Sequence, residues 1–238
     1  ARARQVQGID PVRDVLLGML ASADEPIAGG RHKVFGRHEM AIIPQTSTIS
    51  SQLPRAMGVA FTIGRARKLD TQIAWHDDAV VVCSFGDASA NHSTAVGAIN
   101  ASCHAAPAHL PVPILWVCED NGLGVSVRTP TGWIEVAFCD RPRMRYLAVD
   151  GTDPVAVMQA TADLVEGIRR DRRPAFLHLK TVRYMGHAGS DVEASYRARD
   201  EIRRDYERDP ILGTARAIVA QGAATPAQLT ERFEQVRT

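Results

Sequence analysis

The chain has 238 residues, of which 45% are hydrophobic and 23% charged, the composition of an ordered globular protein. Its formal net charge of +1 gives no reason to expect binding to nucleic acid or to an anionic membrane surface. No apolar run approaches the length needed to cross a bilayer, so we expect no membrane partner, and the length suits one large α/β domain with a tail.

The first predicted element is a helix that begins at Asp10-Pro11, where Asp supplies the N-cap and Pro occupies the first turn. The apolar residues that follow recur at helical spacing, and Met19 and Leu20 are predicted to belong to the core. Residues 23–53 are loop-rich, and a loop of this length inside a compact domain is usually functional or disordered. A second helix is predicted from Pro54.

Two short apolar runs then frame the most informative stretch of the chain. The runs AVVVCSF (79–85) and ILWVCE (114–119) predict strands covered on both faces, and the Ala-rich segment between them predicts a crossover helix. Two strands joined in this way are parallel and adjacent. The polar turns that follow them, Gly86-Asp87 and Asp120-Asn121-Gly122, are therefore expected at the same carboxyl edge of the sheet, where open α/β folds bind ligands.

The two turns offer a carboxylate at Asp87 and an amide oxygen at Asn121, hard ligands that suit Mg²⁺ or Ca²⁺. One alternative is that these residues only cap helices and form turns. Another is a dinucleotide site at Gly122-x-Gly124, but Val127 stands where the third glycine of that pattern belongs.

Further strands and helices alternate towards the C-terminus. Strands are predicted at RYLAVDG (145–151) and PAFLHLKTV (174–182), with a helix capped by Asp153-Pro154 between them. His178 is interpreted as a packed strand residue. The alternation predicts an α/β fold with a doubly wound parallel sheet and helices on both faces. The four cysteines show no CxxC spacing and are predicted to be reduced structural thiols of a cytoplasmic protein.

The motifs GDASAN (86–91) and EDNG (119–122) look like the thiamine diphosphate motif. A polar stretch from Arg183 to Pro210, with Gly186-His187 near its start, extends the match. The whole chain resembles the α subunit, or the α half of a fused chain, of the thiamine diphosphate-dependent decarboxylating component of 2-oxo acid dehydrogenase complexes.

The resemblance implies a single thiamine diphosphate-binding α/β domain over residues 1–238, lacking an N-terminal portion. Within this domain it implies a cofactor-facing loop at 23–53, an active-site loop at 182–200 and a C-terminal helical tail at 210–238.

The same resemblance assigns the site. Asp87, Asn121 and the backbone carbonyl of Leu123 would bind Mg²⁺, and His187 would act near the diphosphate and the reacting carbon, where a histidine can donate a hydrogen bond or move a proton. The predicted cofactor contacts, which include these residues, are Ser47, Ile49, Ser51, Gly86, Asp87, Ala88, Ser89, Asn121, Leu123 and His187.

This sequence departs from the family pattern in several places. Ala88 replaces the usual glycine, and the spacing from Asp87 to Asn121 (121 − 87 = 34) is a few residues longer than expected. Ala188 stands where animal members carry a regulatory phosphoserine. The Tyr-Arg pair that holds the diphosphate in the family is not found, and its role is not transferred to Arg2 or Arg4.

The implied function is oxidative decarboxylation of a 2-oxo acid, with acyl transfer to a lipoyl group of a partner acyltransferase. The resemblance also implies an α2β2 assembly in which a β subunit, or β half, supplies the glutamate that contacts the pyrimidine. A branched-chain 2-oxo acid is the first expected substrate and pyruvate the second. Two alternatives stay open: another thiamine-dependent enzyme half, of the acetoin dehydrogenase or transketolase type, and a non-catalytic α/β module that has lost the site.

Overall fold

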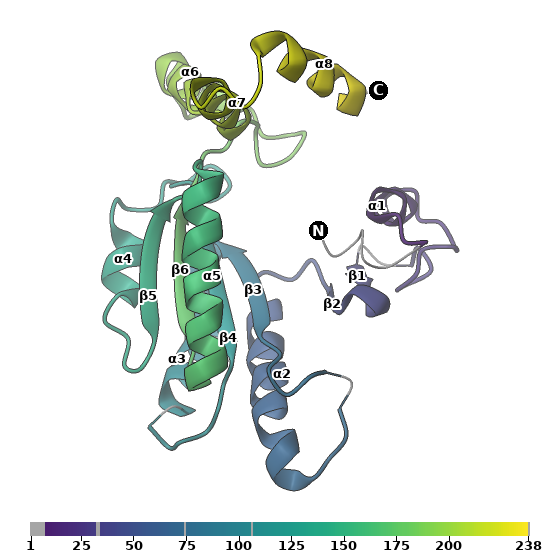
Figure 1. Ribbon diagram of the computed structural model, residues 1–238, viewed down its shortest axis with the longest axis vertical. Helices are drawn as coiled ribbons and strands as arrows, with labels where there is room; N and C mark the ends of the chain where they lie inside the picture. The colour runs from purple at the N-terminus through teal and green to yellow at the C-terminus, as the bar shows by residue number, and fades with distance from the viewer. Residues whose placement is uncertain (1–7, 32–33, 74, 106, 238) are drawn as a thin grey trace.

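The computed structural model of the protein describes residues 8–31, 34–73, 75–105 and 107–237 (Figure 1). Its centre is a parallel sheet in the order β3-β4-β6-β5, built from Val81–Gly86, Ile114–Asp120, Ala175–Lys180 and Arg145–Asp150. The two strands that precede the polar turns, β3 and β4, are adjacent and parallel, which confirms the prediction made from the apolar runs.

Helices cover both faces of this sheet (Figure 1). On one face, α5 (Pro154–Asp171) packs its buried residues against β4 and β6. On the other face lie α2 (Gln52–Ala66), α3 (Ser93–Ala105) and α4 (Trp133–Phe138), which share a second apolar cluster with the strands. A short 3-10 turn, η3 (Arg67–Leu69), follows α2. The doubly wound α/β class predicted from the alternating elements is therefore confirmed.

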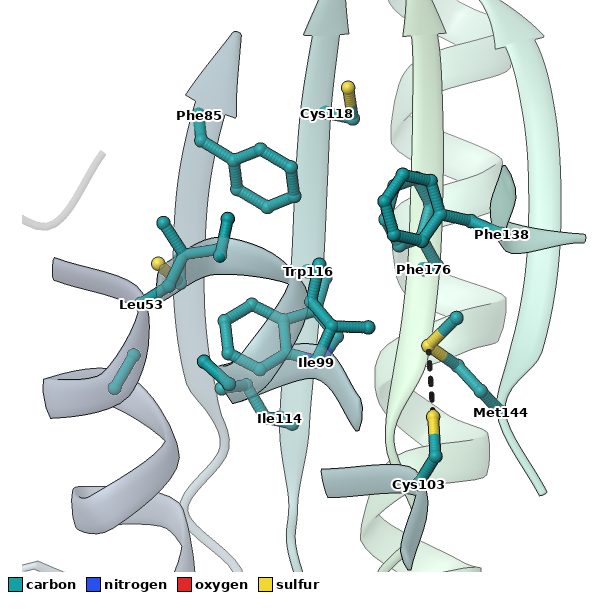
Figure 2. Packing of buried hydrophobic residues seen from close by; sticks show 14 of the residues in the cluster. Leu53, Phe85, Ile99, Cys103, Ile114, Trp116, Cys118, Phe138, Met144 and Phe176 are labelled. Carbon is teal, nitrogen blue, oxygen red and sulfur yellow. Dashed lines mark hydrogen bonds between the residues drawn. The ribbon is translucent and has the colours of Figure 1, made fainter. Parts of the chain in front are cut away.

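Aromatic rings form the centre of the larger cluster (Figure 2). Phe176 is fully buried and contacts three other rings: its centroid lies 4.9 Å from that of Phe138, 5.7 Å from that of Tyr146 and 6.0 Å from that of Phe85. Trp116 on β4 is also fully buried. This packing holds the middle of the sheet rigid below the carboxyl ends of its strands.

The strand β3 differs from the prediction that both of its faces are covered. It is the edge strand of the sheet, and its side chains alternate between buried and open positions. Cys83 and Phe85 face the core, whereas Val82 is 61% exposed. The central strand β4 has five consecutive buried residues and fits the prediction, because only a strand with neighbours and helices around it is enclosed.

The N-terminal part lies beside the sheet (Figure 1). Asp10 caps α1 (Pro11–Met19) as predicted, accepting hydrogen bonds from the backbone amides of Val12 and Arg13. The prediction that Met19 and Leu20 belong to the core is wrong: their exposed fractions are 66% and 76%, because α1 does not pack against the sheet.

The loop-rich segment contains secondary structure that was not predicted. The strands β1 (Phe35–Arg37) and β2 (Ile42–Gln45) pair antiparallel around a 3-10 turn, η2 (His38–Met40). Both strands are short, and their sequences show no clear two-residue alternation that would have identified them.

The C-terminal elements stand beyond the carboxyl ends of the strands (Figure 1). A 3-10 turn, η5 (Glu193–Ser195), leads into α6 (Arg199–Glu207), and the tail forms α7 (Pro210–Ala220) and α8 (Pro226–Arg237). The two tail helices agree with the prediction. No helix among the described residues is long and apolar enough to cross a membrane. All four cysteines are free thiols.

Candidate functional site

The two predicted turns meet at the carboxyl edge of the sheet. The register of β3 and β4 pairs Gly86 with Glu119, so the next residues, Asp87 and Asp120, lie side by side at this edge, where Asp120 still pairs with Lys180 of β6. A short 3-10 turn, η4 (Ser89–Asn91), and then α3 follow Asp87 on the chain. Parallel pairing therefore places Asp87 and the Asn121 turn together, as the sequence predicted.

Asp87 is a buried carboxylate, 1% exposed. Burial raises its pKa above the ordinary value, and the negative charge of Asp120 acts in the same direction. Hydrogen bonds from the Thr129 hydroxyl and from the backbone amides of Asp87 and Asn121 oppose the rise in pKa.

Among the described residues, no basic side chain forms an ion pair with Asp87. A buried carboxylate without a counter-charge is costly, and a bound divalent cation is a chemical means of compensating it. The environment of Asp87 therefore fits a metal ligand.

The Asn121 turn is fixed by its own side chains. Asp120 Oδ1 accepts a hydrogen bond from the backbone N–H of Gly122 at 2.9 Å, and Asn121 Oδ1 accepts one from the backbone N–H of Leu123 at 3.1 Å. Gly122 has a φ of +74°, the left-handed conformation that glycine adopts without a steric penalty. Asn121 Oδ1 keeps a second lone pair, so the amide retains the capacity to bind a cation.

The geometry argues against the dinucleotide alternative. A dinucleotide fingerprint requires the glycines to open a helix directly after the strand. Here Gly122 and Gly124 lie in an irregular loop, in which Leu123 pairs with Arg128 as an antiparallel bridge. The next helix, α4, begins only at Trp133.

The departure at Ala88 is accommodated locally. The Ala88 side chain is exposed. A Cβ atom added to Gly124 would lie 3.3 Å from the Cβ of Ala88, which is a tight contact. The glycine at position 124 therefore leaves room for the methyl group of Ala88. The carbonyl of the next residue, Ser89, accepts a hydrogen bond from Ser50 Oγ at 2.9 Å. This bond attaches the 23–53 loop to the Asp87 turn.

Within that loop, the predicted contact residues and the observed anchor differ. Ser47 is exposed and Ile49 is 59% exposed, while Ser51 Oγ lies 2.9 Å from Thr46 Oγ1. Ser50, which sequence reasoning passed over, is buried and has a φ of +63°. The loop is thus held at the sheet edge by Ser50, and Ser47 and Ile49 remain on its open side.

The loop at 182–200, predicted to be an active-site loop, is attached to the Asn121 turn. Arg183 Nη1 donates hydrogen bonds to the carbonyls of Gly124 (3.2 Å) and Val125 (3.0 Å). Arg128, three residues after Val125, forms a bidentate ion pair with Glu201, with distances of 3.0 and 2.7 Å. These contacts bring a loop from the end of β6 against the turn that follows β4.

His187 lies in this loop with an exposed side chain. Its backbone N–H donates to Asp191 Oδ2 at 2.6 Å, and the Tyr196 hydroxyl donates to the same oxygen at 2.8 Å. The hydrogen bond from the His187 backbone amide is the main reason that the pKa of Asp191 lies below its ordinary value. Asp191 therefore fixes the backbone at His187, and the imidazole is left open to solvent.

The structure thus brings together four predicted regions: the Gly86–Ser89 turn, the Asn121–Leu123 turn, the 23–53 loop and the 182–200 loop. Sequence reasoning missed Ser50, Thr129 and Arg183, which connect these regions, since a lone serine, threonine or arginine in a loop carries no spacing signal. The roles assigned to the predicted site residues stay predictions. Arg2 and Arg4 lie outside the described residues.

Few side chains at this edge of the sheet could act as metal ligands. Among the described residues, no group of three or more His, Cys, Asp or Glu side chains gathers as a metal site. A cation held here by protein alone would be poorly coordinated. Mg²⁺, however, is commonly held by one or two protein oxygens together with the oxygens of a bound phosphate. The residues present therefore fit Mg²⁺ in company with a diphosphate.

The sequence of this chain is similar to those of known proteins. Residues 5–238 match the sequence profile of the family described as "Dehydrogenase E1 component". The 2-oxoisovalerate dehydrogenase subunit alpha of Bacillus subtilis (strain 168) is 28% identical over 205 residues, which cover 84% of this chain and 58% of that protein. The mitochondrial pyruvate dehydrogenase E1 component subunit alpha type I of Ascaris suum is 30% identical over 191 residues, which cover 79% and 45%. The chain thus spans about half the length of the curated relatives it matches.

A comparison of structures matches transketolase from Leishmania mexicana at a TM-score of 0.45 and 15% identity, covering 81% of this chain and 33% of that chain. The fold assignment above rests on the strand order and pairing of this chain. The family profile covers almost the whole sequence and confirms the resemblance drawn from its motifs. The chain belongs to the dehydrogenase E1 component family.

Proposed function

We propose that this chain is the α part of a thiamine diphosphate-dependent 2-oxo acid dehydrogenase. In this proposal it carries out oxidative decarboxylation together with a β subunit or β half and passes the acyl group to the lipoyl group of a partner acyltransferase. Membership of the dehydrogenase E1 component family and the likeness to relatives named as 2-oxoisovalerate and pyruvate dehydrogenase α subunits support it. By the same likeness, a branched-chain 2-oxo acid is the first proposed substrate and pyruvate the second.

One observation of the structure carries the proposal furthest. Asp87 is buried at the carboxyl edge of the sheet, and no basic side chain of the described residues pairs with it. It lies against the turn that presents Asn121 and Leu123. In the proposal the side chains of Asp87 and Asn121 and the carbonyl of Leu123 bind Mg²⁺, which in turn holds the diphosphate of the cofactor.

The remaining residues take, in this proposal, the roles that the family resemblance implies. Gly86, Ala88 and Ser89 line the diphosphate, and Ser47 and Ile49 of the 23–53 loop approach the pyrimidine. The thiamine ring supplies the electron sink that permits loss of carbon dioxide, and the protein supplies binding and orientation. His187, the open imidazole of the 182–200 loop, donates a hydrogen bond or moves a proton at the acyl-transfer end.

The proposal includes an α2β2 assembly whose β subunit contributes the glutamate that contacts the pyrimidine. This requirement leads to a simple expectation: the chain alone binds the cofactor weakly and does not turn over substrate. Overall activity of the purified chain without a β partner would contradict the proposal. The four free thiols are in keeping with the reducing cytoplasm, which we propose as the location.

The test is a calorimetric titration of thiamine diphosphate into the chain assembled with its β partner, with and without Mg²⁺. We expect Mg²⁺-dependent binding that Asp87→Ala weakens at least about tenfold, since even outer-shell partners of a metal site are worth about 10- to 100-fold in affinity. Asp150→Ala is the matched control, because Asp150 ends β5 at the same edge of the sheet, at the opposite end of the strand order from β3.

Two results would remove the proposal. The first is an assembly that binds no thiamine diphosphate under any of these conditions, which would favour a non-catalytic module that keeps the fold. The second is equal loss of binding in the Asp87 and Asp150 variants, which would indicate a general effect of losing a carboxylate at the sheet edge.

A further inference from the structure

A chain of hydrogen-bonded side chains crosses three strands beneath the Asn121 turn. It consists of Tyr146 on β5, His178 on β6 and Asp120 at the end of β4. The Tyr146 hydroxyl lies 2.6 Å from His178 Nδ1, and His178 Nε2 lies 2.8 Å from Asp120 Oδ2. His178 is 2% exposed, so the imidazole is enclosed between its two partners.

The direction of each hydrogen bond follows from the chemistry of the partners. An ionised carboxylate only accepts, so His178 Nε2 carries a proton and donates it to Asp120. In the neutral ring Nδ1 is then an acceptor, and the Tyr146 hydroxyl donates to it. Each polar atom of the imidazole therefore has one matched partner, and the ring is fixed in a single orientation.

The far end of this chain reaches the predicted metal ligands. The Asp120 oxygen that does not contact His178, Oδ1, accepts the backbone N–H of Gly122. The backbone carbonyl of Asp120 is also held, by the N–H of Thr181 at 2.8 Å. Asn121 lies between Asp120 and Gly122, so the direction of its side chain depends on where the Asp120 carboxylate is held.

We infer that Tyr146 and His178 are positioning residues for the Asn121 turn. By fixing the Asp120 carboxylate, they orient the Asn121 side chain and the Leu123 carbonyl for binding the cation and the diphosphate. The inference rests on the proposed function, because it assigns these two buried residues a part in holding the cofactor. Neither residue was assigned such a part from the sequence, where His178 was interpreted as a packed strand residue.

The competing explanation is purely structural: a buried polar group must be hydrogen-bonded wherever it lies, and these three residues satisfy one another. The two explanations differ in what a variant changes. A structural role lowers stability and leaves the geometry of the bound metal intact. A positioning role changes metal affinity and metal geometry by more than the loss of stability accounts for.

The experiment uses the assembly with the β partner. The dissociation constant of thiamine diphosphate is measured over a range of Mg²⁺ concentrations, and the electron paramagnetic resonance spectrum is recorded with Mn²⁺ in place of Mg²⁺. Tyr146→Phe removes one hydroxyl and keeps the ring. His178→Leu removes both hydrogen bonds, and His178→Gln restores a donor to Asp120. Phe138→Leu is the matched control, because Phe138 stacks in the same core and its side chain forms no hydrogen bond with this chain.

We expect His178→Leu to weaken Mg²⁺-dependent binding about tenfold or more, in the range seen for outer-shell partners of metal sites. Tyr146→Phe should weaken it measurably but by less than His178→Leu, since the donor to Asp120 remains. Both should alter the Mn²⁺ spectrum. His178→Gln should recover most of the affinity, and Phe138→Leu should keep the wild-type affinity and spectrum.

The outcomes separate this inference from the proposed function. If the wild-type assembly shows no Mg²⁺-dependent binding, the proposed function fails and the inference fails with it. If the wild type binds and the His178 and Tyr146 variants behave like Phe138→Leu, only the inference is overturned. Should His178→Leu fail to fold, Tyr146→Phe and His178→Gln still decide between the two explanations.

Discussion

Arg197 is buried among three carboxylates, and its replacement tests how the 182–200 loop is held. Its side chain is 2% exposed and makes ion pairs with Glu193 at 2.5 Å, Glu201 at 2.9 Å and Asp205 at 2.5 Å. We call these four residues the Arg197 cluster. It joins the end of the loop to α6, and Glu201 continues the connection to Arg128 beside the Asn121 turn.

The cost of Arg197→Met follows from the burial of the partners. Removing one partner of a fully buried ion pair costs about 3–5 kcal/mol, because the remaining charge is left uncompensated. Here the carboxylates Glu193, Asp205 and Glu201 have side chains 13%, 20% and 24% exposed, so they regain part of their hydration. We therefore expect a smaller loss of about 2–3 kcal/mol, confined to this part of the chain.

Hydrogen exchange measures this local free energy. The amide of Arg197 donates to the carbonyl of Glu193, and the amide of Tyr196 donates to the same carbonyl, so both are protected while the turn is formed. A loss of about 2–3 kcal/mol raises the opening equilibrium about 30- to 150-fold, and exchange of these amides should accelerate by that factor. Amides of the central strand β4 should keep their wild-type rates.

Arg203→Met is the matched control. Arg203 lies on the same helix and also pairs with two carboxylates, Asp200 and Glu207, but its side chain is 69% exposed. Exposed pairs contribute about 0–1 kcal/mol, so this variant should change exchange less than about fivefold. Wild-type exchange in Arg197→Met, or equal acceleration in the two variants, would refute the argument from burial.

Two further predictions concern the core and the acid range. Phe176→Leu removes a fully buried ring that contacts three others and should lower the free energy of unfolding by about 2–3 kcal/mol in denaturant titrations. Phe233→Leu, at a 54% exposed position, should stay within about 0.5 kcal/mol, and equal effects would be evidence against the ring packing. The pKa of Glu201 is lowered to about 2, chiefly by the hydrogen bond from Arg128. A carboxyl group whose pKa is lowered on folding stabilises the fold at pH values above its ordinary pKa of 4.5. This stabilisation is lost as the pH falls from 4.5 towards about 2. Wild type should therefore lose more stability than Glu201→Gln between about pH 6 and about pH 3, and parallel profiles would contradict the assignment.

The sheet and its two polar turns were predictable because their signals are local. A run such as ILWVCE is too apolar for a surface segment and too short for most helices, and the Asp120-Asn121-Gly122 turn that follows marks where it ends. The crossover between the strands fixes them as parallel. From these facts alone, Asp87 and Asn121 had to lie at one edge.

The edge position of β3 and the exposure of α1 were not predictable in the same way. Val82 and Met19 are apolar, and apolar residues in regular elements are usually buried. Whether such a residue is covered depends on which other segments reach it, and periodicity does not contain that information. The antiparallel pair β1 and β2 was missed for a different reason, because strands of three and four residues are too short for an alternating pattern.

The contacts that assemble the site lie beyond the reach of sequence patterns because each joins distant segments. Ser50 reaches Ser89 across 39 positions, and Arg128 reaches Glu201 across 73. A serine or a charged side chain in a loop can bond to many different partners or remain in solvent. Its residue type and spacing therefore do not predict which partner it has. The strand ends thus determine where a ligand can bind, whereas the bonds between loops determine the shape of the site. Arg197→Met tests this second set of contacts through Glu201, which pairs with both Arg197 and Arg128, whereas Tyr146→Phe tests the bonds between the strands that lie beneath the Asn121 turn.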